Sequence, residues 1–490
     1  MLIQVIQLAA LLPLAGRGVP APQDRSAALP TCFEDLGLLK QKVEQDYAGF
    51  QLEITGDRRR AYDQAVQRFR AAATRAEGDA CYFLLRDYVA WFNDPHLFVY
   101  QSGRIDSAES ARRAAAVRMT GLDEAAIRKQ LVARIDRLDP LEGIWYDQRL
   151  RLGVVADPAG PRGRFIAVVL TPDTATWRAG AVRATFTRRQ DGTYDAEVFA
   201  PNYARRLLDA SIHRRVLLRL SPGIWGKEFP LAPVDSGQLD PVDAHRPTLR
   251  RRPGTVIVAV PSHDPAFIPL LDSLLKANEG ALDSADRFIV DLRGNEGGAS
   301  FVTDALYPWF VSPGMPPAPE LKSREGLMLS SPDQIAYAQR AFGSDTSAFV
   351  RGLVARLTAS PGALVPLYDT TVPPEAPSPY PPPRGQARVG FLVDRGTVSA
   401  SEVILLDARQ SARVTTFGEP TAGALDYQSV NIVRLGPEEN RWFLGYPTIT
   451  RNRRLPEGGM RGKGIVPEVR LDLARLADPI GEVERALSRR

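Results

Sequence analysis

A serine able to act as a nucleophile stands at Ser399, where an apolar run leads into a helical pattern. The segment 393–402 reads V-D-R-G-T-V-S-A-S-E. A serine at the start of a helix exposes its hydroxyl at the positive end of the helix dipole, which favours anionic intermediates. Ser399 and Glu402 are equally typical of an ordinary capping box, so this segment alone leaves both interpretations open.

Two further segments combine an apolar run with a turn. Residues 289–298 read I-V-D-L-R-G-N-E-G-G, and residues 417–424 read F-G-E-P-T-A-G-A. Glycines let a backbone approach a ligand closely and direct its N–H groups outward. The first segment fits neither a P-loop nor a dinucleotide fingerprint, and the second indicates only a turn when taken alone.

Together and in this order, the three segments resemble the tail-specific, or C-terminal-processing, serine protease family. Its members carry a strand ending D-L-R-x-N-x-G-G, then S-A-S-E opening a helix, then G-E-x-T-x-G. The resemblance covers roughly 253–470 and includes 463–468, K-G-I-V-P-E, which is similar to the family's G-I-x-P-D. It implies an α/β fold with a crotonase-like ββα core and hydrolysis of peptide bonds through a serine acyl-enzyme.

The resemblance also implies roles for individual residues. By match to the motifs, Ser399 is the nucleophile, and the amides of Gly298 and Ala400 form the oxyanion hole. Losing one such donor typically costs about 2.7–4 kcal/mol of transition-state stabilisation. The matching supporting positions are Gly297, Glu402 and Thr421.

The catalytic base is where the sequence departs from the best-known branch of the family. That branch uses a lysine directly after G-E-x-T-x-G, and Ala424 occupies this position. Another branch, like the tricorn core protease and the interphotoreceptor retinoid-binding proteins, carries a histidine in an N-terminal helical domain within D-x-H-T/S. Residues 92–97, F-N-D-P-H-L, are similar to that motif, although Leu97 replaces the hydroxyl residue. The match implies His96 as general base.

Two questions about the catalytic base stay open: which histidine acts as the base, and which carboxylate orients it. The chain has four histidines, His96, His213, His245 and His263. His263 follows an apolar run and competes with His96, whose alternative role is to cap a helix C-terminus. In the tricorn-like branch a downstream glutamate orients the histidine, and Glu457, 58 residues after Ser399, occupies a fitting place. Its alternative is an exposed loop carboxylate.

The elements that must position these residues follow a clear order along the chain. Residues 31–140 show apolar residues at three- and four-residue intervals, which predicts an N-terminal helical domain. Residues 141–240 carry short alternating segments, which predict a small antiparallel β domain. Residues 253–490 alternate strand and helix, which predicts a covered α/β protease core. We expect no PDZ domain, because no carboxylate-binding pattern of that kind occurs.

Composition excludes several classes of protein. The 490 residues include 62 Lys and Arg against 57 Asp and Glu, a formal net charge of only +5. The densest basic runs, 58–60 and 250–252, have no interleaved aromatic residues, so nucleic-acid binding is not expected. No stretch after residue 16 is long and apolar enough to cross a bilayer. No Cys or His lies at ligand spacing, so we expect no metal, and the chemistry requires no cofactor.

The N-terminus favours export, to the periplasm or the medium. Residues 2–15 are apolar and small residues follow, which is typical of a signal peptide over 1–21, although its basic first part is missing. A frayed N-terminal helix is the alternative. In an exported protein the isolated pair Cys32 and Cys81 predicts a disulfide, against the alternative of two buried thiols.

These observations predict an exported serine peptidase that acts on a peptide or protein substrate. Ser399 attacks the peptide carbonyl and His96 serves as general base. One alternative is a non-catalytic protein that binds a hydrophobic ligand on the same fold, which Ala424 keeps open. The other is an esterase or amidase that acts on a small substrate by the same chemistry.

Overall fold

The computed structural model describes residues 31–489. Residues outside the description are 102–106, 148, 173–175, 202, 221–222, 236, 317, 319–325, 342–346, 368–379, 437–440 and 451–457. The predicted signal peptide and Glu457 therefore lie outside the described residues. The chain forms two compact units, each built from separate segments. The first unit comprises Met1–Arg104, Pro317–Pro377 and Gly423–Gly464, and the second comprises Ile105–Pro316, Ser378–Ala422 and Ile465–Arg490.

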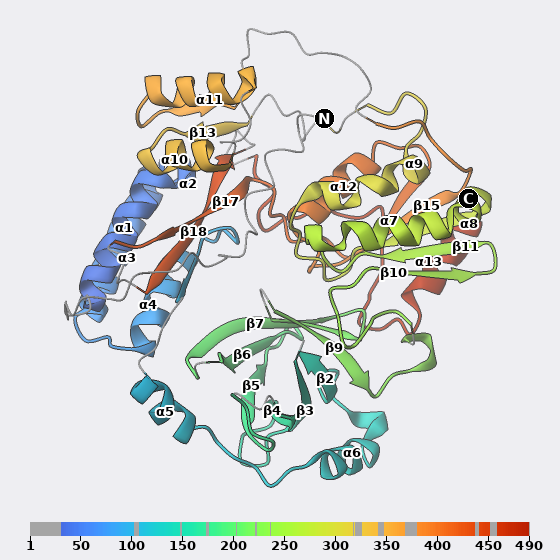
Figure 1. Ribbon diagram of the computed structural model, residues 1–490, viewed down its shortest axis with the longest axis horizontal. Helices are drawn as coiled ribbons and strands as arrows, with labels where there is room; N and C mark the ends of the chain where they lie inside the picture. Colours follow the sequence, from blue (N-terminus) through green and yellow to red (C-terminus); the bar gives the residue numbers. More distant parts are fainter. Residues whose placement is uncertain are drawn as a thin grey trace, which may run out of the picture. The chain divides into compact units, whose positions relative to one another are not determined.

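The first unit packs helices against a five-stranded sheet (Figure 1). Its helices are α1 (Cys32–Asp46), α2 (Ala48–Glu53), α3 (Gly56–Ala73), α4 (Asp79–Ala90), α10 (Pro332–Ala341) and α11 (Ala348–Ala359). Its strands are β1 (Phe98–Gln101), β13 (Leu327–Leu329), β14 (Leu364–Pro366), β17 (Tyr427–Arg434) and β18 (Trp442–Thr450). Central β18 pairs with β1, β13 and β17, so N-terminal and C-terminal segments share one sheet.

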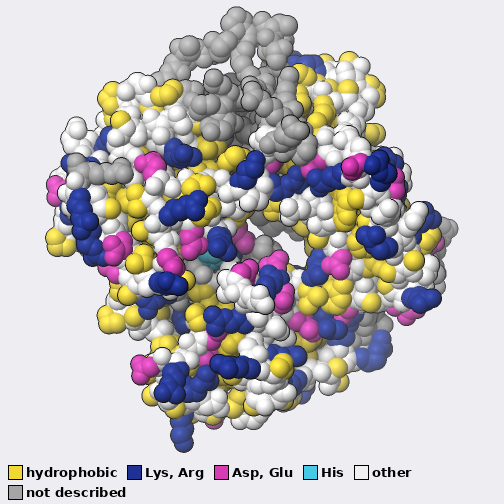
Figure 2. Space-filling view, turned by 180° about the vertical axis from the view of Figure 1, so that it is seen from behind, with side chains coloured by type: hydrophobic (Ala, Val, Ile, Leu, Met, Phe, Trp, Pro, Cys, Tyr) yellow, Lys and Arg dark blue, Asp and Glu magenta, His cyan; other side chains and the backbone are white. Residues whose placement is uncertain are grey.

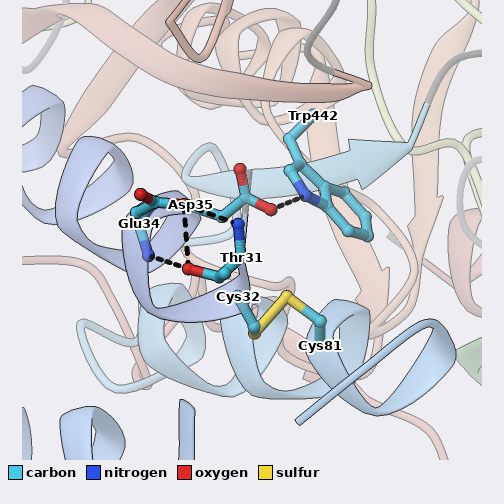
Figure 3. The surroundings of a disulfide bond; sticks show 6 residues. All are labelled: Thr31, Cys32, Glu34, Asp35, Cys81 and Trp442. Carbon is cyan, nitrogen blue, oxygen red and sulfur yellow. Dashed lines mark hydrogen bonds between the residues drawn. A yellow bond between two sulfur atoms is a disulfide. The ribbon is translucent and has the colours of Figure 1, made fainter. Parts of the chain in front are cut away.

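A capping box and a disulfide fix the start of α1 (Figure 3). Thr31 caps the helix, and its N–H donates to Glu34 Oε2 at 2.7 Å. Cys32 is joined to Cys81 of α4 by a disulfide with Cα atoms 5.5 Å apart. On the neighbouring face of α1, the Asp35 carboxylate accepts a hydrogen bond from the Trp442 indole of β18 at 2.6 Å. The disulfide and this hydrogen bond tie α1 both to α4 and to the sheet.

The second unit contains an eight-stranded antiparallel barrel that closes through pairing of its first and last strands. The strands are β2 (Gly143–Asp147), β3 (Leu150–Ala156), β4 (Arg164–Thr171), β5 (Val182–Arg188), β6 (Tyr194–Phe199), β7 (Arg205–His213), β8 (Leu217–Leu220) and β9 (Gly223–Phe229). Helix α5 (Ser107–Ala115) precedes it, and α6 (Glu124–Val132) packs Ile127 and Leu131 against it. Alternate strand residues fill its interior, among them Trp145, Phe186 and Trp225.

A six-stranded sheet forms the rest of the second unit. Its order is β10 (Thr248–Arg252), β11 (Thr255–Ala259), β12 (Arg287–Asp291), β15 (Arg388–Val393), β16 (Val414–Gly418) and β19 (Val469–Arg470). All neighbours after β11 run parallel, and the central strands are apolar because both faces of a parallel sheet are covered. The covering helices include α7 (Ile268–Ala277), α8 (Glu279–Ser284), α12 (Ala400–Ala408) and α13 (Pro479–Ser488). Helix α13 packs Ile480, Val483 and Leu487 onto one face.

One expected helix takes a tighter form. The sequence predicts a helix over Phe301–Phe310, but Ser300–Leu306 forms a 3-10 helix (η5), and only Tyr307–Phe310 is α-helical (α9). Pro308 lies in the first turn of α9 and has no N–H to donate to the Asp304 carbonyl, which accepts the Tyr307 N–H instead. The proline therefore marks the boundary between the two helix types.

The parallel strands end at one edge of the sheet, and the three motif segments follow those ends. The glycine turn follows β12, Ser399 follows β15, and Thr421 follows β16. In open α/β sheets ligands bind at the carboxyl ends of the strands. The mixed α/β architecture confirms the fold class predicted from the sequence.

Basic and acidic side chains are interspersed over the face shown in Figure 2. Within the part of the chain that the structure describes, no helix has the length and apolarity needed to span a membrane.

Candidate active site

Ser399 is held in a strained backbone conformation between β15 and α12. Its φ is 55° and its ψ is −111°, a region that residues other than glycine rarely adopt. Such strain costs on the order of 1–3 kcal/mol and clusters at functional sites. Glu402 holds the turn, because its Oε2 accepts the Ser399 N–H at 2.9 Å and its own N–H donates to the Ser399 carbonyl at 2.8 Å.

A chain of hydrogen bonds joins the serine segment to the segment after β16. The side chain of Glu402 is completely buried, and its Oε1 accepts a hydrogen bond from the Thr421 hydroxyl at 2.6 Å. The same hydroxyl accepts the N–H of Ile465 at 2.7 Å. Glu402 and Thr421 therefore stabilise the Ser399 turn through hydrogen bonds, and both stand at positions that the sequence motifs identified.

The glycine turn after β12 lies directly against Ser399. Gly297 has a φ of 88°, and a methyl group placed on it would come within 2.9 Å of Ser399 Cβ and of Ala400 N. It would also lie 2.7 Å from the Val398 carbonyl oxygen. Only a glycine combines this backbone conformation with so close an approach. The turn at Gly297 and Gly298 and the start of α12 thus form one packed structure.

Two backbone N–H groups beside the serine lack a protein acceptor. Ala400 is the first residue of α12, so its N–H has no acceptor inside the helix. Across the described ranges, neither the Ala400 N–H nor the Gly298 N–H donates to another protein group. Donors of this kind, at the positive end of a helix, are suited to stabilise a negatively charged oxygen.

His263 lies beneath the glycine turn. It is completely buried, and its Nδ1 lies 3.1 Å from Asn295 Oδ1 and 3.3 Å from Ser401 Oγ. Burial lowers the pKa of His263 to about 4, although the hydrogen bond with Asn295 acts in the opposite direction. These contacts make His263 a neutral packing residue beside Ser401.

Asp394 joins the serine segment to the glycine turn, a role that no local sequence pattern indicated. Its Oδ1 accepts the N–H of Gly294 and the N–H of Gly396, both at 2.9 Å. Its Oδ2 lies 2.5 Å from His213 Nδ1. Burial by itself would raise the pKa of Asp394, but the charge and hydrogen bond of His213 and the Gly294 amide together lower it.

His96 belongs to the first unit and lies on a tight turn that follows α4. The Asp94 Oδ1 accepts the His96 backbone N–H at 2.9 Å and lies 3.9 Å from the ring Nδ1. The Tyr47 hydroxyl donates to Asp94 Oδ2 at 2.8 Å. Burial lowers the pKa of His96, against the charge of Asp94 and a hydrogen bond to the Tyr427 backbone. Burial also raises the pKa of Asp94.

A second carboxylate anchors this turn. Glu53 accepts hydrogen bonds from the Tyr427 hydroxyl at 2.6 Å and from Arg58 at 2.8 Å, and it pairs with Arg461. Arg461 also donates to the Phe92 carbonyl at 2.9 Å, just before the turn. Asp94 was not identified from the sequence as a site residue, although it supplies the first letter of the D-x-H pattern.

The second unit thus brings six predicted site residues into one region. They are Gly297, Gly298, Ser399, Ala400, Glu402 and Thr421. His96 and Ala424 belong to the first unit. Glu457 lies outside the described residues. Among the residues that the structure describes, no group of three or more His, Cys, Asp and Glu side chains is arranged to hold a metal.

One protein family model matches part of this chain. Residues 265–471 match the model of Peptidase family S41. No curated protein matches the chain.

Three solved structures align with most of this chain at low sequence identity. Mature CPAF in complex with lactacystin is 12% identical, with 93% of this chain and 98% of that chain covered and a TM-score of 0.44. A lipoprotein from Streptococcus agalactiae is 10% identical, with coverage of 96% and 100% and a TM-score of 0.38. The photosystem II D1 C-terminal processing protease is 15% identical, with coverage of 94% and 98% and a TM-score of 0.34.

The family match spans the glycine turn, the Ser399 segment and the segment around Thr421, the three motifs on which the predicted resemblance depends. That resemblance to the tail-specific serine proteases is confirmed. Over residues 265–471 the chain matches peptidase family S41, and it is a serine peptidase, a hydrolase that acts on peptide or protein substrates.

Proposed function

We propose that the chain is an exported serine peptidase of the Ser–His branch, with Ser399 as nucleophile and His96 as general base. The observation that carries the proposal is the strained turn at Ser399, packed against Gly297 and followed by the N–H of Ala400, which has no acceptor among the described residues. A strained serine at a helix start, beside free amides, is suited to attack a carbonyl and to receive the resulting charge.

In the proposed reaction the Ser399 Oγ attacks the peptide carbonyl carbon, and its proton moves to His96. The amides of Gly298 and Ala400 hold the oxyanion. His96 then gives the proton to the leaving amine as the C–N bond breaks. Water attacks the acyl-enzyme with His96 again accepting the proton, which restores Ser399. The reaction uses no cofactor.

The environment of His96 suits a general base. Burial lowers its pKa, so the ring is neutral and able to accept a proton at neutral pH. Asp94, 3.9 Å from Nδ1, stabilises the imidazolium that forms when the proton arrives. We propose that Glu457 is the carboxylate that orients His96, as a downstream glutamate does in this branch.

The proposal extends to organisation and location. We infer a crotonase-like ββα core within 253–490, a helical domain over 31–140 and a small β domain over 141–240, without a PDZ domain. A signal peptide over 1–21 directs export to the periplasm or the medium, where a disulfide between Cys32 and Cys81 is stable.

A substrate panel tests the proposed function. The purified mature protein is incubated with denatured casein, a peptide library and small esters, beside Ser399→Ala. We expect peptide cleavage by the wild type and none by Ser399→Ala. Hydrolysis of esters alone would favour the small-substrate esterase. If neither class is cut, the ligand-binding alternative that Ala424 leaves open would replace the proposal.

A further inference from the structure

A second serine, histidine and aspartate meet elsewhere in the second unit. The Ser211 Oγ lies 2.6 Å from His213 Nε2, and the His213 Nδ1 lies 2.5 Å from Asp394 Oδ2. Ser211 and His213 are two residues apart on β7, so their side chains share one face of the strand. Asp394 comes from the end of β15, far away in the sequence. None of these contacts involves Ser399.

The geometry sets the direction of proton transfer. Asp394 is held as an acceptor because its other oxygen binds the amides of Gly294 and Gly396. It therefore accepts the Nδ1–H of His213, so that in the neutral ring the Nε2 lone pair faces the Ser211 hydroxyl. This tautomer is the one that a Ser–His–Asp triad requires.

The histidine ring is fixed between two glycines. A methyl group on Gly294 would lie 2.9 Å from His213 Cγ, and one on Gly396 would lie 2.7 Å from His213 Nε2. Both glycines therefore leave room for the ring and hold it in place. The next two residues, Arg214 and Arg215, have φ values of 54° and 63°, and such strained positions cluster at functional sites.

The serine is open to a cavity while its partners are buried. His213 is 7% exposed and Asp394 is 4% exposed, whereas Ser211 is partly exposed. All three line a cavity of about 1420 Å³ within the second unit. This volume exceeds that of typical ligand pockets, so it admits a small ester.

Two cations on the cavity wall already have partners. Lys227 donates to the Pro140 carbonyl at 2.9 Å, and Arg215 lies 3.4 Å from Asp235. An uncharged ester needs no counter-ion from the wall.

We propose that Ser211, His213 and Asp394 form a second nucleophilic site, which hydrolyses small uncharged esters with good leaving groups such as phenyl esters. The Ser211 Oγ bonds to the acyl carbon as its proton moves to His213 Nε2. The ester C–O bond breaks, and the alcohol leaves with that proton. Water then attacks the acyl group, His213 takes its proton and returns it to Ser211, and the carboxylic acid departs.

Fluorophosphonate labelling of the Ser399→Ala protein tests this site without altering it. Trypsin releases residues 207–214, L-L-D-A-S-I-H-R, in which Ser211 is the single serine, whereas Ser399 lies in 396–409. We expect label on 207–214 in Ser399→Ala, and hydrolysis of 4-nitrophenyl acetate that falls by about 100-fold or more in Ser399→Ala/Ser211→Ala. Ser284→Ala, which removes an exposed hydroxyl bonded to the Gly280 carbonyl, is the matched control.

Labelling of the two sites is measured on different tryptic peptides, so the two proposals can be refuted independently. Absence of label from 207–214 in folded Ser399→Ala protein, shown by an unchanged melting temperature, overturns the second site and leaves the role of Ser399 untouched. Ester hydrolysis that survives in Ser399→Ala/Ser211→Ala also overturns it. Label on 207–214 without label on 396–409 in the wild type supports Ser211 and contradicts the proposed role of Ser399.

Discussion

Replacing Gly297 by alanine tests whether the glycine turn sets the geometry of Ser399. The added methyl group would come within 2.9 Å of Ser399 Cβ and of Ala400 N, closer than a carbon atom is tolerated. These neighbours are backbone atoms or the root of a side chain, so the turn or the serine must move by several tenths of an ångström. Small displacements of catalytic groups cost on the order of 100-fold in rate.

The effect of Gly297→Ala has two parts, a loss of stability from the backbone conformation and a loss of rate from the collision, and a control variant separates them. Alanine at a φ of 88° costs about 1–2 kcal/mol of stability, whatever surrounds it. Gly192, in the turn after β5, has a φ of 85° with no atom within 4 Å of its added methyl group. Gly192→Ala therefore carries the backbone cost without the collision. A 100-fold loss in Gly297→Ala corresponds to about 2.7 kcal/mol of transition-state stabilisation.

The assay is the second-order rate of fluorophosphonate labelling on residues 396–409, followed by mass spectrometry. We expect Gly192→Ala to label at the wild-type rate and Gly297→Ala to label about 100-fold more slowly or worse. Gly297→Ala should lose at least as much thermal stability as Gly192→Ala, because it adds the collision to the same backbone cost. Equal labelling rates in the two variants would refute the inference that the glycine turn positions Ser399 and its oxyanion donors.

Three further results are expected. Thr421→Val should lower the free energy of unfolding by about 1–3 kcal/mol, because buried Glu402 loses its hydrogen-bond donor. Thr421→Ser, which keeps the hydroxyl, should restore the stability, and urea unfolding measures both variants. Loss of the disulfide in Cys32→Ala/Cys81→Ala should cost about 2–4 kcal/mol by the same measurement, and an unchanged midpoint would contradict this. Because burial lowers the pKa of His96, labelling of Ser399 should stay constant as pH falls to about 6.5 and decline only below it; a decline already above pH 7 would contradict this protonation state.

Local patterns located the strand-to-turn junctions, and the family resemblance assigned roles to the residues within them. Ser399, Glu402 and Gly297 fall where a strand meets a turn, and such junctions are visible as apolar runs followed by glycine or a helix cap. The contact between His213 and Asp394 spans 181 residues and follows from how β7 meets the end of β15. No local pattern encodes that meeting, so Asp394 was missed.

The composition of the two compact units also depends on contacts between distant segments, which local patterns do not encode. The sequence indicated contiguous ranges, whereas β17 and β18 pair with β1 and join the N-terminal helices in the first unit. Strand pairing between distant segments depends on the complementarity of whole edges, which a single sequence does not reveal. The alternating pattern within single strands was still informative, because β5 and β6 lie within the range 141–240 that was predicted to form antiparallel strands.

Labelling of the wild type, Ser399→Ala and His96→Ala tests the proposed pairing of Ser399 with His96 most directly. His245→Ala, which removes a half-buried histidine of the second unit, is the matched control. We expect label on 396–409 in the wild type and in His245→Ala, none there in Ser399→Ala, and a rate lowered by about 10²–10⁴ in His96→Ala. Label on 396–409 at the wild-type rate in His96→Ala would contradict the role of His96 as base, and its absence from the wild type would contradict an activated Ser399.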